Sequence, residues 1–350
     1  MGHTRRSFLK LAGAAGLGAA AAPGVLEAAQ TQTKARSGAR NGNARKELPR
    51  NMTFCTLRRE GRFVLGVRTA RGVLDVEKAA KALRRPAPAT TIDELLQGTD
   101  AQALRSLVDA ALANDGARAA LVPEEQAQFG PCVTNPEKII MLGYNYRKHV
   151  QEMKQQVPTS PVFFNKYNNA LNWNGGVINL PQKVAKKFDY EVELVVVMGK
   201  TARDVPPEKA LDYVFGYCTG NDFTARDLQS KTSQFMLGKT PDGFGPLGPW
   251  LVGAEQIPDV QNLKLQTFVN GEIRQNSNTA DMIFDVKTIV SYASQHWTLK
   301  AGDIFFTGTP EGVINGMPPE KQIWLKPGDV VVTSIEKLGD LRITLAPQQA

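Results

Sequence analysis

Cysteine and histidine are scarce in this 350-residue chain, and their scarcity excludes two kinds of site. The cysteines are Cys55, Cys132 and Cys218, and the histidines are His3, His149 and His296. No two cysteines have C-x-x-C spacing, which argues against a structural zinc site, and their odd number argues against a disulfide-built scaffold. One pair can still bridge in an oxidising compartment. Three dispersed histidines exclude a zinc enzyme built on several of them.

The folded part of the chain also lacks a large excess of positive charge. The formal net charge is +8, but residues 1–50 carry +7 of it, which leaves +1 for residues 51–350. A nucleic-acid-binding protein is expected to present a basic surface or a basic arm. Only the tail at residues 31–50 would favour that function, so we expect no nucleic-acid partner. The sequence also shows no internal repeat and no glycine-rich phosphate loop.

The apolar stretch near the N-terminus is too short to span a bilayer. It covers residues 11–22, whereas a membrane helix needs ~20 apolar residues. The paired arginines of Thr4–Lys10 precede it, in the pattern of a twin-arginine export signal. We predict that residues 1–29 are a twin-arginine signal peptide and that the mature protein is periplasmic or secreted, with no stable membrane anchor. This export route is associated with proteins that fold before they are exported.

Composition then separates a linker from a first folded region. Residues 30–50 are rich in polar and basic residues and have no apolar face, so we predict a disordered linker. Residues 51–130 combine short strands around a Glu60-Gly61 turn with helical apolar spacing at 101–113. No cluster of reactive residues occurs in this region, and we predict a small N-terminal domain with a supporting role.

Residues 131–346 have the character of a catalytic domain rich in strands. Apolar runs typical of interior strands, a hairpin signal at Asn270-Gly271 and an amphipathic helix at 285–297 occur in it. The predicted strands lie at residues 139–142, 192–198, 267–269, 305–306 and 330–335. Many strands and few helices predict an α+β protein that is rich in β structure.

Carboxylates on one strand predict a metal site. Glu191 and Glu193 are two apart, so in a strand they point to the same face. Two carboxylates on one rigid face suit Mg²⁺, Mn²⁺ or Ca²⁺. A solvated strand face is the alternative, but the apolar residues that follow favour burial, where adjacent carboxylates repel unless a cation or protons neutralise them. Asp222 offers a third carboxylate, or else it is the N-cap of a helix.

Basic and polar residues near these carboxylates suit an active site. His149 and Glu152 are three apart and face each other on a helical turn, as a general base and its orienting carboxylate do. A routine surface pair is the alternative. Arg226 can hold a substrate carboxylate with its bidentate fork. The Thr307–Gly312 turn follows a buried strand, and its backbone N–H groups and the Thr309 hydroxyl could receive a carboxylate or oxyanion, unless it is only a tight turn.

Together these motifs resemble the fumarylacetoacetate hydrolase family over residues 135–345. The motifs that match, in the family's order, are Leu142–Tyr146 with His149 and Glu152, Pro161–Phe164, Asp189–Glu193, Asn221–Gln229, Gly238-Lys239, Pro246–Pro249 and Thr307–Pro310. The resemblance implies a mixed β-sheet roll, usually dimeric, with one Mg²⁺ or Mn²⁺ in each site. The implied metal ligands are Glu191, Glu193 and Asp222. The implied acid–base pair, on a mobile lid, is His149 and Glu152. The implied substrate contacts are Arg226, Gln229, Lys239 and Thr309.

The sequence departs from the commoner family pattern in three places, which can reshape the pocket. Tyr144 stands where many relatives carry Arg or an aliphatic residue, and Asn172–Gly176 replaces a more usual Gly/Pro-rich turn. Residues 314–322 lengthen the segment after the Thr307–Pro310 turn. These differences leave the exact substrate open.

The implied activity is cleavage of a C–C bond in an acylpyruvate-like 2-oxo acid. A metal would stabilise the enolate that this reaction forms, and His149 with Glu152 would activate water. Lys239 would act with Gln229 to stabilise the oxyanion. A 2-oxo acid isomerase or decarboxylase on the same site is the alternative, since fold does not fix reaction. A non-catalytic exported protein that binds a metal–oxo acid complex is the alternative from another class.

Overall fold

The computed structural model describes residues 47–348. The predicted signal peptide at 1–29 and most of the predicted linker therefore lie outside the described residues. Residues 47–50, which we assigned to the linker, belong to the folded part instead: Leu48 is 7% exposed, and Arg50 Nη2 donates to the Leu211 carbonyl. The described residues belong to one compact unit, so the boundary predicted at residue 130 falls inside it and stays a prediction.

The N-terminal part is a small antiparallel sheet covered by helices. Its elements are β1 (Thr53–Arg59), β2 (Arg62–Thr69), β3 (Gly72–Asp75), β4 (Leu121–Val122), α1 (Val76–Ala82), α2 (Ile92–Leu96) and α3 (Ala101–Leu112). The turn between β1 and β2 forms as predicted, because Glu60 and Gly61 both adopt positive φ. Side-chain caps begin all three helices, from Asp75, Thr91 and Asp100.

A ten-stranded sheet joins this part to the rest of the chain. Its order is β4-β3-β2-β1-β14-β11-β10-β17-β5-β6, with β1 antiparallel to β14. The strands beyond β1 are β14 (Leu251–Gly253), β11 (Val214–Asn221), β10 (Val192–Met198), β17 (Ile304–Phe306), β5 (Ile139–Gly143) and β6 (Val162–Lys166). The side chains of β10 and β11 are buried along their whole length, which explains their continuous apolar character.

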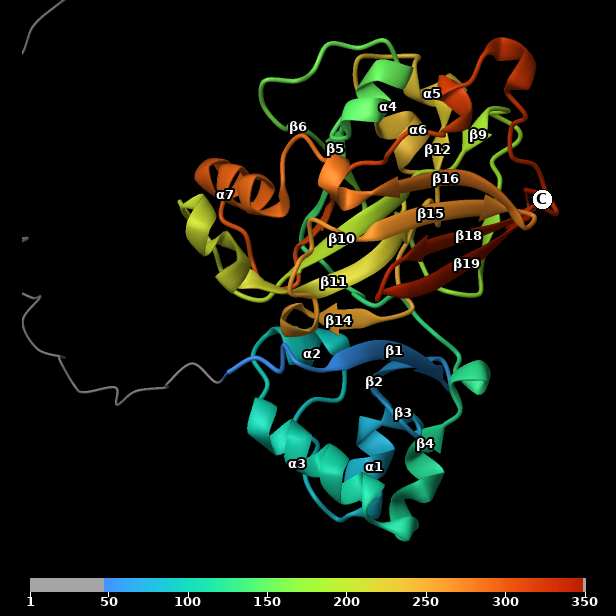
Figure 1. Cartoon of the computed structure of the whole chain (residues 1–350). Helices are drawn as coiled ribbons and strands as arrows, with labels where there is room; N and C mark the ends of the chain where they lie inside the picture. The colour runs from blue at the N-terminus through green and yellow to red at the C-terminus, as the bar shows by residue number, and fades with distance from the viewer. Residues whose placement is uncertain (1–46, 349–350) are drawn as a thin grey trace, which may run out of the picture. The chain divides into compact units, whose positions relative to one another are not determined.

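A second sheet of five strands packs beside the first (Figure 1). Its order is β16-β15-β18-β19-β8, from β16 (Glu272–Asn278), β15 (Lys264–Val269), β18 (Val330–Ile335), β19 (Gly339–Ala346) and β8 (Gly176–Asn179). Asn270 and Gly271 have positive φ at the β15–β16 turn, so the predicted hairpin is confirmed. The helix predicted at 285–297 is α7 (Val286–His296), which Asp285 caps.

Short elements complete the described chain. The strands are β7 (Leu171–Asn172), β9 (Phe188–Asp189), β12 (Thr224–Ala225) and β13 (Gly245–Pro246), and the helices are α4 (Arg147–Glu152), α5 (Arg226–Gln229) and α6 (Met236–Lys239). The 3-10 helices are η1 (Asp115–Ala120), η2 (Glu124–Gln126), η3 (Asn168–Ala170), η4 (Pro207–Tyr213), η5 (Ala254–Gln256), η6 (Thr279–Asp281), η7 (Ile314–Gly316) and η8 (Pro319–Lys321). The α+β, strand-rich class that we predicted is confirmed. Across residues 47–348, no helix combines the length and the apolar character that a membrane crossing requires.

The strand directions bring the ends of several strands together at one edge of the large sheet. β10 runs antiparallel to both β11 and β17, and β17 runs parallel to β5. The start of β10 therefore lies at the same edge as the ends of β11, β17 and β5. Figure 1 shows α4, α5 and α6 gathered at this end, away from α1 and α3.

Candidate metal centre and active site

Three buried carboxylates meet where β10 begins and β11 ends. The register pairs Val192 with Asn221, so Glu191 and Asp222 come next to each other, and Asp222 N donates to the Glu191 carbonyl at 2.9 Å. Glu193 joins them, and one ligand atom from each of the three residues lies within 4.8 Å of the other two. All three are at most 5% exposed, which excludes the solvated strand face. Asp222 caps no helix, since the N-cap of α5 is Ala225.

Buried cations offset part of this negative charge. Lys239 Nζ lies 2.8 Å from Glu191 Oε2 and 2.7 Å from Asp222 Oδ2, and Arg226 Nη2 lies 2.7 Å from Glu191 Oε1. Burial alone would raise the pKa of Glu191, but the charges of Lys239 and Arg226 outweigh it and lower that pKa to about 2. The pKa of Glu193 shifts in the opposite direction to that of Glu191. Burial and the negative charges of Asp222 and Glu191 raise the pKa of Glu193 well above its ordinary value.

A divalent cation suits the oxygen donors of this cluster. Asp222 Oδ1 is buried and is paired with Lys166, whose Nζ lies 2.7 Å away. Glu193 Oε2 accepts from Gly308 N at 2.7 Å, which fixes the carboxylate. Three carboxylates without histidine or cysteine form a donor set for a hard cation such as Mg²⁺ or Mn²⁺. Glu191, Glu193 and Asp222 could therefore hold the metal.

The predicted acid–base pair lies on α4 at the same edge of the sheet. His149 Nδ1 is 3.2 Å from Glu152 Oε2, and His149 is only 6% exposed, so the two residues are no routine surface pair. Because Nδ1 is engaged by Glu152, Nε2 is the ring nitrogen left for a substrate. The ring of Tyr144 lies nearly parallel to that of His149, with centroids 6.3 Å apart, and Tyr144 has positive φ.

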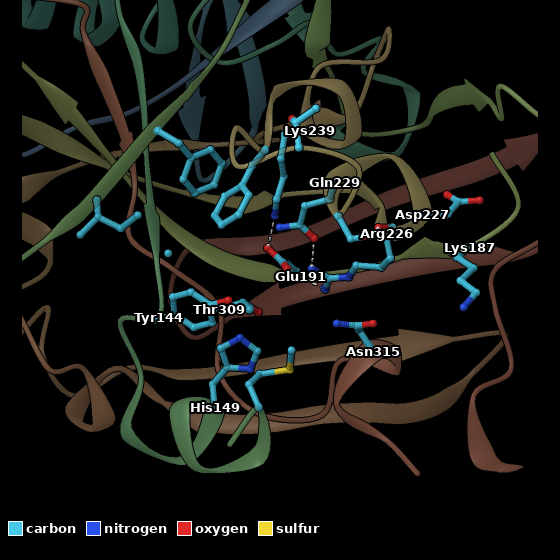
Figure 2. A pocket seen from close by; sticks show the side chains of 17 residues that line it. Tyr144, His149, Lys187, Glu191, Arg226, Asp227, Gln229, Lys239, Thr309 and Asn315 are labelled. Carbon is cyan, nitrogen blue, oxygen red and sulfur yellow. Dashed lines mark hydrogen bonds and ion pairs between the residues drawn. The ribbon is translucent and has the colours of Figure 1, made fainter. Parts of the chain in front are cut away.

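One cavity joins the acid–base pair to the carboxylates. Its volume is about 410 Å³, and its wall includes six of the nine predicted site residues, which are His149, Glu191, Arg226, Gln229, Lys239 and Thr309 (Figure 2). Figure 2 shows His149 across this cavity from Lys239 and Gln229. Of the other three residues, Glu193 and Asp222 belong to the acidic cluster, and Glu152 contacts His149. All nine residues therefore come together, while their individual roles stay predictions.

Arg226 keeps part of its hydrogen-bonding capacity for a substrate. Its Nε donates to Asp189 Oδ2 at 2.9 Å, its Nη1 donates to Gln229 Oε1 at 3.1 Å, and its Nη2 faces Glu191. A guanidinium has five N–H donors, so these three contacts leave two, and Arg226 lines the cavity.

Two backbone N–H groups at the start of the Thr307–Gly312 turn are used within the protein. Thr307 N donates to the Leu194 carbonyl, and Gly308 N donates to Glu193. The predicted role of this turn in receiving a carboxylate or oxyanion stays a prediction. Thr309 does line the cavity, and its hydroxyl accepts from Gln275 Nε2 at 2.9 Å.

Sequence reasoning missed three residues that build the site. Lys166 is 3% exposed and its ammonium also donates to the carbonyls of Phe223 and Lys239. Gln275 accepts from Val192 N, between two of the carboxylates, and donates to Thr309. Asp189 accepts from Arg226 and from two backbone amides of η7. A lysine at the end of β6, two residues after its apolar run, was the one local signal available, because the other contacts join segments far apart in sequence.

The buried carboxylate cluster, which could hold a metal ion, lies beside a cavity that His149 and Lys239 also line. Residues 138–346 match the family model described as fumarylacetoacetate (FAA) hydrolase C-terminal. The chain therefore belongs to the fumarylacetoacetate hydrolase family, as the sequence motifs predicted.

Named relatives in this family carry several activities. The chain is 40% identical over 269 residues to the mitochondrial oxaloacetate tautomerase Fahd2a of Rattus norvegicus, covering 77% of this chain and 82% of the rat protein. It is 37% identical over 276 residues to the oxaloacetate tautomerase YisK of Bacillus subtilis, covering 77% and 91%. The structure of maleylpyruvate hydrolase from Sphingobium sp. SYK-6, in complex with manganese(II) ion and pyruvate, matches with a TM-score of 0.67 at 28% identity, covering 85% of this chain and 100% of that chain.

Proposed function

We propose that this protein is a divalent-metal-dependent enzyme that interconverts the enol and keto forms of a small 2-oxo diacid. The observation that carries the proposal is the shared cavity, in which His149 lies opposite Lys239 with Glu191 between them (Figure 2). A proton donor or acceptor on one side of a substrate and concentrated positive charge on the other are what enol–keto conversion needs. The rat and Bacillus subtilis relatives named as oxaloacetate tautomerases support this choice over the C–C hydrolase that the sequence favoured.

The residues of this chain would divide the chemistry among them. A cation held by Glu191, Glu193 and Asp222 would supply a Lewis acid that stabilises negative charge on the substrate's 2-oxygen. Arg226 and Gln229 would bind a substrate carboxylate from the cavity wall. Lys239 would place its ammonium beside the 2-oxygen and stabilise charge there.

His149 would move the proton. In the direction from enol to ketone, the substrate loses the proton of its 2-hydroxyl to solvent and gains one at carbon 3 from His149, which then regains a proton from solvent, so the protons balance without any co-reactant. His149 Nε2 would deliver the proton at carbon 3, and Glu152 would stabilise the protonated ring through Nδ1. The reverse reaction removes a proton from carbon 3 with the same groups.

Hydrolytic cleavage of an acylpyruvate is the second candidate. It is supported by the likeness to maleylpyruvate hydrolase and by the cavity of about 410 Å³, which has room for an acyl chain and an attacking water. In that reaction His149 would take a proton from water, and the cleaved bond would release pyruvate and a second acid.

A substrate panel separates the two candidates. The metal-free protein should be inactive after chelation and should regain activity with Mg²⁺ or Mn²⁺. With metal, we expect rapid loss of the enol absorbance of oxaloacetate and slow or no release of pyruvate from acylpyruvates. The reverse order of rates would replace the tautomerase with the hydrolase. Binding of metal and oxo acid without turnover of any substrate would replace both with an exported binding protein.

A further inference from the structure

The turn that follows the Thr307–Pro310 motif packs directly on the catalytic pair. Gly312 N donates to Glu152 Oε1 at 2.9 Å, while the other carboxylate oxygen of Glu152 faces His149. Gly316 closes the other side: a Cβ added there would lie 2.4 Å from Glu152 Cδ and 2.5 Å from Cγ. Glu152 is therefore held between an N–H group and a glycine that leaves room for nothing larger than hydrogen.

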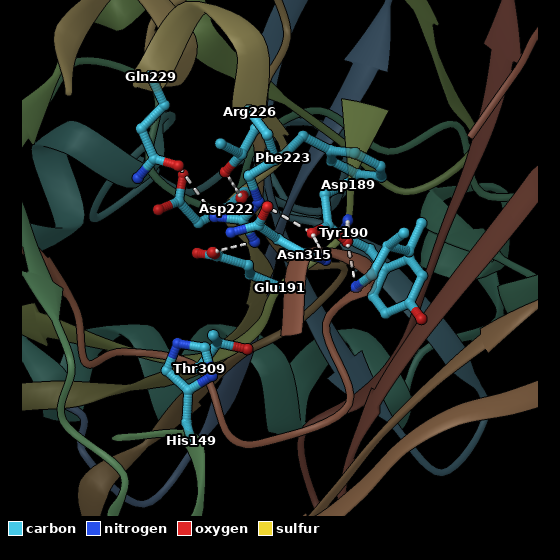
Figure 3. Close-up of polar contacts among 12 residues, drawn as sticks. His149, Asp189, Tyr190, Glu191, Asp222, Phe223, Arg226, Gln229, Thr309 and Asn315 are labelled. Atoms are coloured by element: carbon cyan, nitrogen blue, oxygen red, sulfur yellow. Dashed lines mark hydrogen bonds and ion pairs between the residues drawn. The ribbon is translucent and has the colours of Figure 1, made fainter. Parts of the chain in front are cut away.

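The Gly312–Gly316 turn is held in place by Asp189 and Tyr190, which directly precede the predicted metal ligand Glu191. Asp189 Oδ1 accepts from Ile314 N at 2.9 Å, and Oδ2 accepts from Asn315 N at 3.0 Å (Figure 3). Tyr190 adds a third bond, since its hydroxyl donates to the Gly312 carbonyl at 3.0 Å. Both side chains are at most 1% exposed, so no water competes for these contacts.

Asp189 also holds the residue predicted to bind substrate. Its Oδ2 accepts from Arg226 Nε at 2.9 Å as well as from Asn315 N. One buried carboxylate thus joins the guanidinium on one side of the cavity to the turn that receives Glu152. Asn315 and Arg226 both line that cavity.

We propose that the Gly312–Gly316 turn positions Glu152 for catalysis and that Asp189 is the positioning residue that couples this turn to Arg226. Asp189 touches no reacting atom and acts through its partners. The segment concerned overlaps residues 314–322, where this sequence is longer than the commoner family pattern. The kinetic test of this positioning role rests on the proposed function, whereas the test by hydrogen–deuterium exchange does not.

Gly316→Ala tests whether the turn positions the Glu152 side chain, and Gly116→Ala is the control. Both glycines lie in 3-10 helices, but a Cβ at Gly116 meets only the Asn114 side chain, at 3.0 Å. We expect Gly316→Ala to displace the Glu152 carboxylate and lower kcat about 10- to 100-fold, part of the typical worth of acid–base catalysis, with KM changed less than about threefold. Gly116→Ala should keep the kinetic constants of the unaltered protein. An unaltered kcat in Gly316→Ala would overturn the proposal.

Asp189→Asn tests the coupling, and Asp303→Asn is its control. Asp303 is equally buried and also accepts from two backbone amides, of Lys138 and Lys300, and from the Lys138 ammonium, but it lies outside the cavity wall. The asparagine amide places an N–H₂ group where a carboxylate oxygen accepted from Arg226 or from the Gly312–Gly316 turn. Two donors then face each other, so Arg226 and this turn should both shift. We expect kcat to fall and KM to rise in Asp189→Asn, whereas Asp303→Asn should lower the melting temperature only. If both variants lost stability alone, Asp189 would have a structural role and the coupling would be rejected.

Hydrogen–deuterium exchange gives a readout that needs no substrate. In the Mg²⁺-loaded protein, amides of residues 147–153 should exchange faster in Gly316→Ala and in Asp189→Asn than in the two controls, because α4 loses its anchor at Glu152. Unchanged exchange in both variants would reject the turn as the anchor. If the unaltered protein turned over no oxo acid, the proposed function would fail while this exchange measurement would still decide the positioning role.

Discussion

At the scale of single residues, the acidic cluster is unevenly compensated. Lys239 bridges Glu191 and Asp222, whereas Glu193 receives only the Gly308 N–H group. The pKa values of Glu191 and Glu193 consequently shift in opposite directions. A bound cation would supply the missing positive charge beside Glu193, which is the physical reason to expect metal at this position.

Metal affinity should therefore depend on all three carboxylates. We expect Glu191→Ala, Glu193→Ala and Asp222→Ala each to weaken Mg²⁺ or Mn²⁺ binding by more than about tenfold, since even partners of metal ligands are typically worth 10–100-fold. Calorimetric titration of the chelated protein measures this directly. Unchanged affinity in all three variants would show that the metal lies elsewhere.

The acid–base pair should separate from metal binding. His149→Ala and Glu152→Gln leave the acidic cluster of Glu191, Glu193 and Asp222 unchanged. Metal affinity should therefore stay within about twofold, while turnover should fall by about 10²–10⁴-fold. The double variant should lose less than the product of the single losses, because the two residues act as one unit. Decarboxylation of oxaloacetate needs no proton transfer from carbon 3 and should be impaired less. Equal loss of both reactions would mean that the pair places the substrate and does not move its proton.

The nine site residues could be named from the sequence because they lie in short motifs in a recognisable order. Glu191 and Glu193 share a motif, as do Arg226 and Gln229. Lys166 and Asp189 could not be assigned roles, because their partners are far away in the chain. Lys166 contacts Asp222, 56 residues later, and Asp189 contacts Ile314, 125 residues later. Roles that depend on such contacts require the register of the sheet, which no local pattern contains.

At the scale of elements, the apolar patterns predicted several strands and helices but missed others, including the long strands β11 and β19. β10 matches the predicted run at 192–198, and the β15–β16 turn matches its Asn-Gly signal. β9 and β12 have two residues each, too few for any period to show. The position of β17 between β10 and β5 was also unpredictable, since it follows from long-range pairing.

The turn before β18 supports the site from a distance. Asp329 accepts from Asn270 Nδ2, Lys326 N and Lys326 Nζ, and it thereby fixes the start of β18. Further along this strand, Thr333 Oγ1 accepts from Asn221 Nδ2, and Asn221 in turn accepts from Glu191 N. Burial would raise the pKa of Asp329, but the hydrogen bonds from Asn270 and Lys326 outweigh it and lower that pKa.

This shift predicts a pH-dependent contribution to stability. The folded pKa lies below the unfolded one, so the contribution is present above the unfolded pKa and is lost as pH falls through the folded pKa. Asp329→Asn should lower the free energy of unfolding of the metal-free protein by about 1–2 kcal/mol at pH 7, the usual worth of such hydrogen bonds. Urea denaturation at pH 7 and near pH 3 measures it, with the exposed Asp340→Asn as control. A deficit that is the same at both pH values would contradict the assignment to the charged carboxylate.

At the scale of the whole molecule, the N-terminal part and the family domain share one sheet. β1 pairs with β14, and β14 pairs with β11, which Asp222 directly follows. Residues 51–130 are thus connected to the acidic cluster through three neighbouring strands, while the supporting role predicted for them stays a prediction. The sequence could not show this connection because β1 and β14 are about 200 residues apart in the chain.

Export stays a proposal that rests on residues outside the described structure. The paired Arg5 and Arg6 of the N-terminal pattern precede the apolar stretch at residues 11–22. We propose that the protein folds and acquires its metal before it leaves the cytoplasm. A buried site that takes Mg²⁺ or Mn²⁺ would then be loaded in the compartment where the chain first folds, and the cation would stabilise the folded form by binding it and not the unfolded chain.

Replacing the paired arginines should stop export without harming the enzyme. Arg5→Lys with Arg6→Lys keeps the charge of the N-terminus, so any effect would come from loss of the arginines themselves. We expect the precursor to remain in the cytoplasm with its activity intact, because both positions precede the folded part. Arg36→Lys with Arg40→Lys makes the same chemical change within the predicted linker and should leave export as it was. Fractionation of the cells followed by activity assays measures both. Undiminished periplasmic protein in the Arg5/Arg6 variant would reject the twin-arginine route, and equal retention of the Arg36/Arg40 variant would attribute the effect to arginine content and not to the signal.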